Sequence, residues 1–290
     1  MWFWLALLSA ILGAIEVILS KRILHKVSSS VLAWTTFTLS IPFLFVLSLK
    51  DGIPSLNLIF YIGVFGSSLA FVFAKTIGNR SLKQNLISKI MPLAAFSGVF
   101  TYIFGLILLS ESIRLIPILG LISVVLGSYI LNVDQAKEDF LKPFKIVFAT
   151  KTSVFFLTAV MLGSLTAVLD KLGLNNTTPK SPIFILLVEQ IIMSIMLIPY
   201  LLRNKSKTWI NEIKNNFIGL LLISIVFLIT GLVVFYAYTD GPVALIIGVK
   251  RLQIFFILLM GYLFFKDKPT KHVWVATAIM ILGVLMIRLG

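Results

Sequence analysis

The sequence of 290 residues contains no cysteine, only two histidines and few charged residues. Without cysteine the chain can form neither a disulfide nor a thiolate metal site. Charged residues make up only 12% of the chain, whereas roughly a quarter is usual in soluble domains. The sequence also lacks a Walker A pattern and the clustered His, Asp, Ser or Cys expected of an intramembrane enzyme. We therefore expect no catalytic residues, no metal site and no cofactor.

Apolar residues are abundant, at 59% of the chain, and the mean hydropathy is +1.06. A soluble fold could not cover so much apolar surface, so the composition indicates an integral membrane protein. The net charge of +14 resides in basic residues that lie between the apolar runs. This placement orients helices in a bilayer and argues against nucleic-acid binding. The expected partners are the lipid bilayer and a small-molecule substrate, and the oligomeric state is left open.

Ten apolar runs are long enough to cross a bilayer as helices, which requires about 20 residues each. Their continuous apolar character distinguishes them from transmembrane strands, in which polar and apolar residues alternate. The fourth run contains Lys89 and Pro92. The expected fold is an all-α membrane protein with spans at 2–20, 31–49, 56–74, 85–109, 114–132, 153–170, 182–202, 217–238, 243–265 and 272–289.

The two halves of the chain share a sequence pattern. ILGAIEVILSK, which ends at Lys21, matches MLGSLTAVLDK at an offset of 150. Three further matches share an offset of 156, and they are Gly105 with Gly261, Glu111 with Asp267, and Gly127 with Gly283. We infer two five-helix repeats, at 1–132 and 153–290, joined by a cytoplasmic linker at 133–152. An odd number of spans per repeat places the second repeat upside down relative to the first.

The distribution of basic residues agrees with inverted repeats, because cytoplasmic loops accumulate Lys and Arg. In the first half, the loops after spans one and three contain most of the basic residues, and in the second half the loops after spans seven and nine do. The basic residues of these loops, together with Lys89 at the start of span four, are Lys21, Arg22, Lys26, Lys75, Arg80, Lys83, Lys89, Arg203, Lys205, Lys207, Lys214, Lys266, Lys268 and Lys271. With these loops in the cytoplasm, both termini lie outside, and we expect the plasma (inner) membrane.

Few ionisable residues remain inside the spans, and each is a candidate for function because charge is costly at membrane depth. Lys250 and Arg251 lie together in span nine, where they favour an anion-binding centre with Gln253 nearby. Neutralisation of this pair by a carboxylate from another helix is the structural alternative. Lys89 precedes Pro92 in span four and either assists the site or extends to the headgroups.

Two carboxylates also lie within spans, Glu16 in span one and Glu189 in span seven. Each is interpreted either as a proton-coupling group or as a counter-ion for the basic pair. Tyr236, near the end of span eight, is a candidate substrate contact or an interfacial anchor.

The repeat ends, MPLAAFSGVFTYIFGLILLSESIRLIPILGLISVVLGSYIL and VKRLQIFFILLMGYLFFKDKPTKHVWVATAIMILGVLMI, resemble the EamA-like drug/metabolite transporter superfamily over nearly the whole chain. The Lys250–Arg251 pair and Lys89-Ile-Met-Pro92 resemble the phosphate-binding positions of sugar-phosphate translocators. The resemblance implies that Lys89, Lys250 and Arg251 bind the phosphate of a substrate.

The expected function is secondary transport of a small polar, anionic metabolite that bears phosphate or carboxylate. Binding between the repeats near the midplane would be followed by alternating access to the two sides. The alternative function keeps the fold but exports amino acids or amphipathic drugs in exchange for protons. In that alternative the basic pair is only structurally neutralised.

Overall fold

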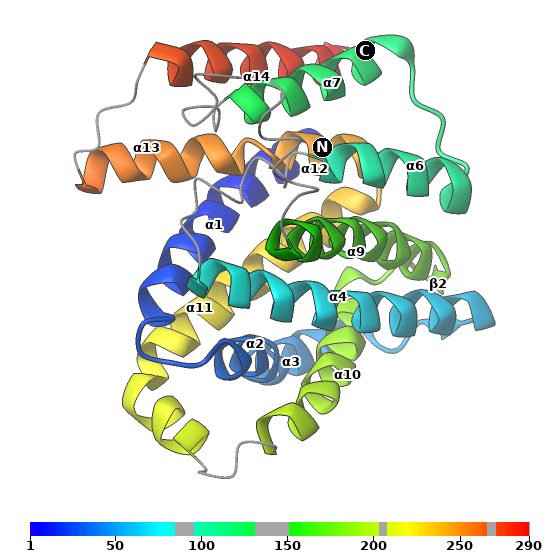
Figure 1. Cartoon of the computed structure of the whole chain (residues 1–290). Helices are drawn as coiled ribbons and strands as arrows, with labels where there is room; N and C mark the ends of the chain where they lie inside the picture. The colour runs from blue at the N-terminus through cyan, green and yellow to red at the C-terminus, as the bar shows by residue number, and fades with distance from the viewer. Residues whose placement is uncertain (85–95, 131–150, 203–207, 266–270, 290) are drawn as a thin grey trace.

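A computed structural model describes residues 1–84, 96–130, 151–202, 208–265 and 271–289 (Figure 1). Within these ranges the chain is almost entirely helical. The helices are α1 (Trp2–Ile23), α2 (Ser29–Thr38), α3 (Ile41–Asp51), α4 (Leu58–Gln84), α6 (Ser97–Leu109), α7 (Leu115–Ile130), α9 (Lys151–Asn175), α10 (Pro182–Leu202), α11 (Thr208–Tyr238), α12 (Val243–Lys250), α13 (Gln253–Phe265) and α14 (Lys271–Leu289). Two short strands, β1 (Ser55–Leu56) and β2 (Thr177–Thr178), pair antiparallel between loops.

The predicted all-α membrane fold is confirmed. In the described residues, 6 helical segments are long and apolar enough to cross a bilayer, and shorter apolar helices accompany them. Large apolar side chains such as Phe65, Ile195 and Leu222 are exposed on the outside of the bundle. A surface of this kind is stable against lipid, because a helix satisfies its own backbone hydrogen bonds there.

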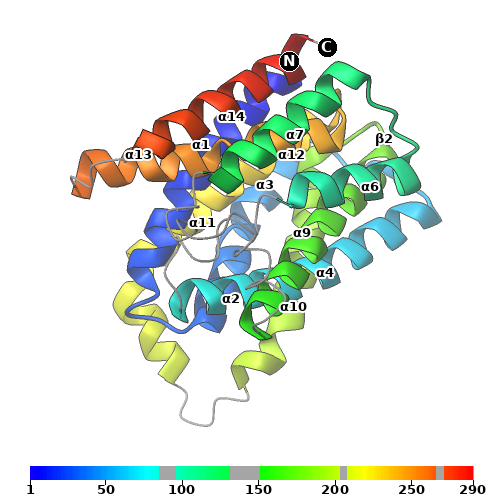
Figure 2. The ribbon, with the colours of Figure 1, turned by 45° about the horizontal axis from the view of Figure 1, so that its top comes forward.

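The packing of the helices reflects the duplication. The α4 helix packs along α9, and α1 packs along α11. The third span of the first repeat thus contacts the first span of the second repeat, and the third span of the second repeat contacts the first span of the first. The last spans of the two repeats, α7 and α14, lie side by side (Figures 1 and 2). Exchanging the repeats therefore returns the same set of neighbours, as two copies of one five-helix unit require.

The offset of 156 recurs in the structure itself. The α6 and α13 helices begin at Ser97 and Gln253 and have 13 residues each. At the crossing of α7 and α14 the same offset relates Gly127 to Gly283 and Gly120 to Ala276. A Cβ on Gly120 would lie 2.5 Å from the carbonyl oxygen of Gly283, and a Cβ on Gly127 would lie 2.8 Å from that of Ala276. Only glycine permits this close approach of two backbones.

Connections and termini are distributed over two faces of the bundle. On one face β1 pairs with β2, Trp2 packs against Gly241, and the Arg288 guanidinium lies over the rings of Phe3 and Trp4. Both termini therefore lie on this face. On the opposite face the Glu212 carboxylate accepts a hydrogen bond from the Ser28 backbone N–H, 2.6 Å away. The assignment of the terminal face to the outside, like the repeat boundaries, stays a prediction.

Several helices extend beyond the predicted spans. The α4 helix continues to Gln84, which moves Lys75 from a predicted loop into a helix. The α11 helix begins at Thr208 instead of 217, with an irregular residue at Asn216. Its added turns are held by contacts of Trp209 and Ile213 with the cluster around Leu24. The predicted second span is divided at Leu39–Ser40, because Pro42 cannot donate a backbone hydrogen bond to the preceding turn.

The crossing of α7 and α14 generates a test of packing. Gly283→Ala places a methyl group 2.6 Å from the Gly120 carbonyl oxygen, so the helices must separate. We expect a loss of about 1–3 kcal/mol of stability, as for other overpacked contacts. Gly78→Ala is the matched control, because a Cβ there meets nothing within 4 Å. Thermal unfolding in detergent measures both, and equal melting temperatures would contradict the close contact.

Candidate functional site

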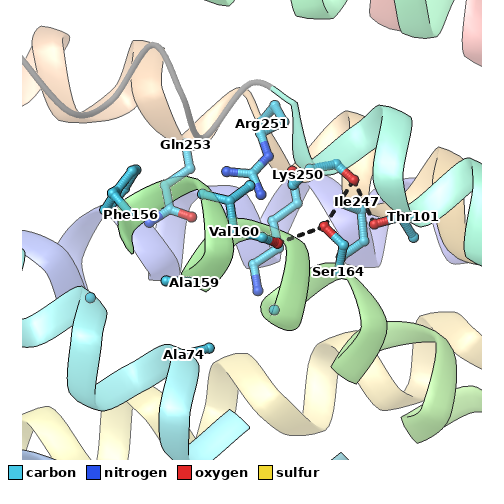
Figure 3. Close-up of a pocket in the computed structure, with 13 residues that line it drawn as sticks. Ala74, Thr101, Phe156, Ala159, Val160, Ser164, Ile247, Lys250, Arg251 and Gln253 are labelled. Carbon is cyan, nitrogen blue, oxygen red and sulfur yellow. Dashed lines mark hydrogen bonds between the residues drawn. The ribbon is translucent and has the colours of Figure 1, made fainter. Parts of the chain in front are cut away.

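A cavity of about 290 Å³ lies between helices of the two repeats (Figure 3). The first repeat contributes residues of α4 and α6, and the second contributes residues of α9, α12 and α13. The lining combines a basic pair, four polar side chains and several apolar or small residues. They are Ala74, Gly78, Ser97, Thr101, Phe156, Ala159, Val160, Gly163, Ser164, Ile247, Lys250, Arg251 and Gln253.

Lys250 and Arg251 enter this cavity from the end of α12. Lys250 is seven residues from the start of its helix, so its Cα is about 10 Å from the helix start. Within the described ranges, neither residue forms an ion pair or a hydrogen bond through its side chain, and the Arg251 Nε is buried without a partner. Two half-buried cations without a direct ion-pair partner among these residues make the cavity electropositive.

The backbone changes geometry at this pair. The Arg251 N–H donates to both Ile247 and Gly248 carbonyls, and the Leu252 N–H donates to the Val249 carbonyl. The bonds to Gly248 and Val249 span three residues each and form a tight turn, which ends α12 before α13 starts at Gln253. Such a turn within a span often marks a functional hinge. The first residues of α13 and α6, Gln253 and Ser97, both line the cavity.

Gly13 and Gly163, which match in the repeat alignment, have different surroundings. A Cβ on Gly13 would lie 2.7 Å from the Oε1 atom of Gln253, so the glycine makes room for this amide. A Cβ on Gly163 would meet nothing within 4 Å and would project into open space beside the cavity. The cavity is therefore asymmetric, although the repeats that form it are related.

Glu16 is paired with Lys75. Its Oε1 atom lies 2.6 Å from Lys75 Nζ, and that ammonium also lies 4.8 Å from the centre of the Phe227 ring. The sequence left open whether Glu16 or Glu189 neutralises the basic pair of α12. In the structure Glu16 has another cation as its direct partner. Lys75 was not predicted to lie in the membrane, because it follows the apolar run of its span.

Glu189 lies beside a second carboxylate, Asp170, which sequence analysis also missed. Both residues are buried, and the Ser67 hydroxyl donates a hydrogen bond to Asp170 Oδ1. The carboxyl groups of Asp170 and Glu189 are in hydrogen-bonding contact. Asp170 is the last residue of the predicted sixth span and directly precedes Lys171, so it was not distinguished from the charged residues of the following loop. The repeat alignment could have indicated that Asp170 lies within the membrane, because the matching residue, Ser20, lies inside the first predicted span.

Lys171 lies at the terminal face of the bundle. Its ammonium is 2.5 Å from Glu111 Oε1 and 2.6 Å from the Gly241 carbonyl oxygen. Glu111 Oε2 accepts the Val243 N–H, at 2.9 Å, where α12 begins. These bonds join the end of α9, the loop after α6 and the start of α12.

The remaining predicted site residues lie elsewhere. Tyr236 is 43% exposed on α11 and does not line the cavity. Lys89 lies outside the described residues, as does Pro92.

The family model for the EamA-like transporter family matches residues 1–133 and 150–289. The chain belongs to this family. The two matched stretches contain the helices of the two repeats, and the predicted superfamily is thereby confirmed. An EamA-like protein is a membrane transporter of small solutes, in accord with the expectation that the chain is not an enzyme. The chain is thus an integral, multi-pass membrane protein.

Other comparisons add the fold alone. A crystal structure with 14% sequence identity matches with a TM-score of 0.68 and covers 97% of both chains. No curated protein matches this chain.

The absence of cysteine permits a direct test of the electropositive cavity. Gly163→Cys introduces one thiol into the lining. We expect an anionic sulfonate thiol reagent to be favoured over a cationic ammonium reagent by about tenfold relative to free cysteine. Replacing Lys250 and Arg251 by glutamine should abolish the preference. Ala33→Cys, which is fully buried in the core, should resist both reagents. A cationic preference would contradict the electrostatic interpretation.

Proposed function

We propose that this EamA-like protein is a secondary transporter of a small anionic metabolite that bears phosphate or carboxylate. The observation that supports this proposal best is the pair of Lys250 and Arg251 in the cavity, which has no direct ion-pair partner among the described residues. An apolar bundle does not retain two unpaired cations for stability, because replacing them by neutral residues removes a desolvation cost. An anion that binds between the repeats would supply the missing charge.

The two cations offer different chemistry to such a ligand. Arg251 provides a planar guanidinium that can donate two parallel hydrogen bonds to a phosphate or carboxylate. Lys250 provides a flexible point charge, and the Gln253 amide and Thr101 hydroxyl add polar groups from both sides of the cavity. The resemblance to sugar-phosphate translocators adds Lys89 to this proposal. Tyr236 would then serve as an interfacial residue instead of a ligand contact.

The cavity volume favours a metabolite over a large drug. About 290 Å³ is at the lower limit of small-molecule sites, which range from roughly 300 to 1,000 Å³. The apolar lining from Phe156, Val160 and Ile247 would contact a carbon skeleton. These residues are also the feature that would suit the alternative substrate, an amphipathic drug or amino acid.

Alternating access requires that the terminal face open and close. The Lys171–Glu111 pair and the bond from Glu111 to Val243 hold α12 against the first repeat at that face. Since α12 also contains Lys250, movement of its start would be transmitted to the site over about two turns of helix. We propose that these bonds form when the terminal face is closed and break when it opens.

The first test compares ligand-induced stability in two double variants. A phosphate- or carboxylate-bearing ligand at 100 times its Kd should stabilise the natural protein by about 2.7 kcal/mol. Lys250→Gln/Arg251→Gln should lose this effect and melt at a higher temperature without ligand, because two half-buried charges without an ion-pair partner are removed. Lys50→Gln/Arg114→Gln, which removes one exposed lysine and one exposed arginine, should behave like the natural protein.

A thermal-shift screen against anionic, zwitterionic and cationic metabolites measures these effects, and transport in liposomes follows for any hit. If only neutral or cationic compounds stabilise the protein, and the Lys250→Gln/Arg251→Gln variant responds equally, the exporter function replaces the anion proposal.

The second test concerns access from the terminal face. Glu111→Gln removes the charge that holds both Lys171 and the Val243 N–H. Because a hydrogen bond to a charged group is worth about 1.5–3 kcal/mol, we expect the terminal-open state to become at least about tenfold more populated. The rate at which Gly163→Cys reacts with a thiol reagent added on that side should rise accordingly. Glu212→Gln, on the opposite face, is the control, and an unchanged rate in Glu111→Gln would contradict the proposal.

A further inference from the structure

The contact between Asp170 and Glu189 has an unfilled hydrogen-bonding position. Glu189 is 2% exposed, and its Oε1 atom is buried without a hydrogen-bond partner. Ionised carboxylates only accept hydrogen bonds, so two of them in contact leave this position empty and repel each other. A proton on either carboxyl group creates the missing donor and removes the repulsion. The geometry points to one proton shared by the pair.

The other groups around the pair leave this inference intact. Ser67 of α4 supplies one hydroxyl, and the Ser40 hydroxyl of the second span binds the neighbouring Gln190 and not Glu189. The α3 helix has charges only at its exposed end, Lys50 and Asp51. Lys250 of α12 is the further charged group that acts on the pair, and Tyr238 of α11 is a neighbouring phenol that is uncharged at neutral pH. None of them forms an ion pair with either carboxylate in the described residues.

The position of the pair relates it to the anion site. Asp170 is five residues from the end of α9, and Glu189 is seven residues from the start of α10. At 1.5 Å per residue both lie about 8–10 Å from the terminal ends of their helices, at the depth of Lys250 on α12. A positive charge on Lys250 at this depth favours a negative charge on the carboxyl pair, because charges interact strongly in an apolar interior. An anion bound to Lys250 would cancel this effect.

We propose that the Asp170–Glu189 pair binds a proton whose uptake is coupled to binding of the anion. The sign follows from electrostatics. When an anion neutralises Lys250, the pair loses a stabilising positive charge and takes up a proton more readily. Coupling between two sites is reciprocal, so a protonated pair strengthens anion binding by the same factor. Anion and proton would therefore be bound together and carried in the same direction.

The choice of a proton over a metal ion rests on the same contact. The two carboxyl groups lie at hydrogen-bonding distance from each other, which is the separation that a shared proton requires. Ser67 is the one additional oxygen ligand that the described residues place on Asp170, which is too few for the six or more ligands that hard cations prefer. Sodium-dependent stability that does not respond to pH would overturn the assignment.

Infrared spectroscopy of the reconstituted protein tests the proton directly, without any anion. A protonated carboxyl group has a carbonyl stretching band that a carboxylate lacks. We expect a band that is present at neutral pH, shifts in Asp170→Asn and in Glu189→Gln, and disappears in the double variant. Glu212→Gln, which alters a carboxylate near the opposite face, should leave the band unchanged. Absence of the band in the natural protein, or its persistence in the double variant, would overturn the proton site.

Sulfate serves as the probe for coupling, because it does not titrate near neutral pH. Its affinity, measured by thermal shift at several pH values, should rise by about tenfold as the pH falls, within the range usual for coupled sites. The Asp170→Asn/Glu189→Gln variant should bind sulfate without this pH dependence. Pairing the same measurement with a pH dye should show proton uptake on sulfate addition only in the natural protein.

The coupling rests on the proposed function, whereas the proton site does not, and their failures are distinguishable. A titrating infrared band without sulfate binding at any pH leaves the proton site in place and overturns both the anion site as tested with sulfate and its coupling to the proton. Sulfate binding that is independent of pH, with no proton uptake, overturns the coupling and leaves the anion site in place.

Discussion

The arrangement of this bundle depends on the cost of placing charge in an apolar interior. A buried ion needs an opposite charge, a hydrogen-bond donor or water, since lipid offers none of these. Glu16 meets Lys75 across α1 and α4, and Glu111 meets both Lys171 and a backbone N–H at the start of α12. Each compensation joins segments that are far apart in sequence. The ion pairs therefore specify which helices pack together, because apolar surfaces gain little by contacting each other instead of lipid.

The charged and polar groups that lack a partner indicate where a ligand could bind. Lys250 and Arg251 have no ion-pair partner in the described part of the chain, and Glu189 has an unpartnered oxygen. The basic pair lacks a negative charge and the carboxyl pair lacks a hydrogen-bond donor, and the two pairs lie at similar depth in the bundle. Each deficit favours a ligand of a particular charge, and an anion bound together with a proton would reduce both. The proposals for substrate and coupling ion thus follow from one principle applied at two places.

Most of the fold could be predicted from the sequence, because the length and apolar character of a span are local properties. The offset of 156 predicted that spans four and nine would correspond, as α6 and α13 do, and it matched Gly127 with Gly283, which the structure places at the crossing of α7 and α14. The basic pair of α12 was also evident, since both residues lie well inside an apolar run. The bounds of α4 and of α11 were harder to place. Their ends extend past the apolar runs and are stabilised by contacts with other helices, as Trp209 shows.

The partners of the buried charges could not be predicted, because they depend on how helices face each other. Lys75 and Asp170 stand at the ends of apolar runs, where a charge normally reaches the headgroups or solvent. Only the extension of α4 and α9 places them inside the bundle. The duplication gives no further guidance, since Glu16 corresponds to Thr166 and Asp170 corresponds to Ser20. Each repeat has acquired charges that the other lacks. A site built by two related halves has in this way become asymmetric, with the cation pair and the carboxyl pair both in the second repeat.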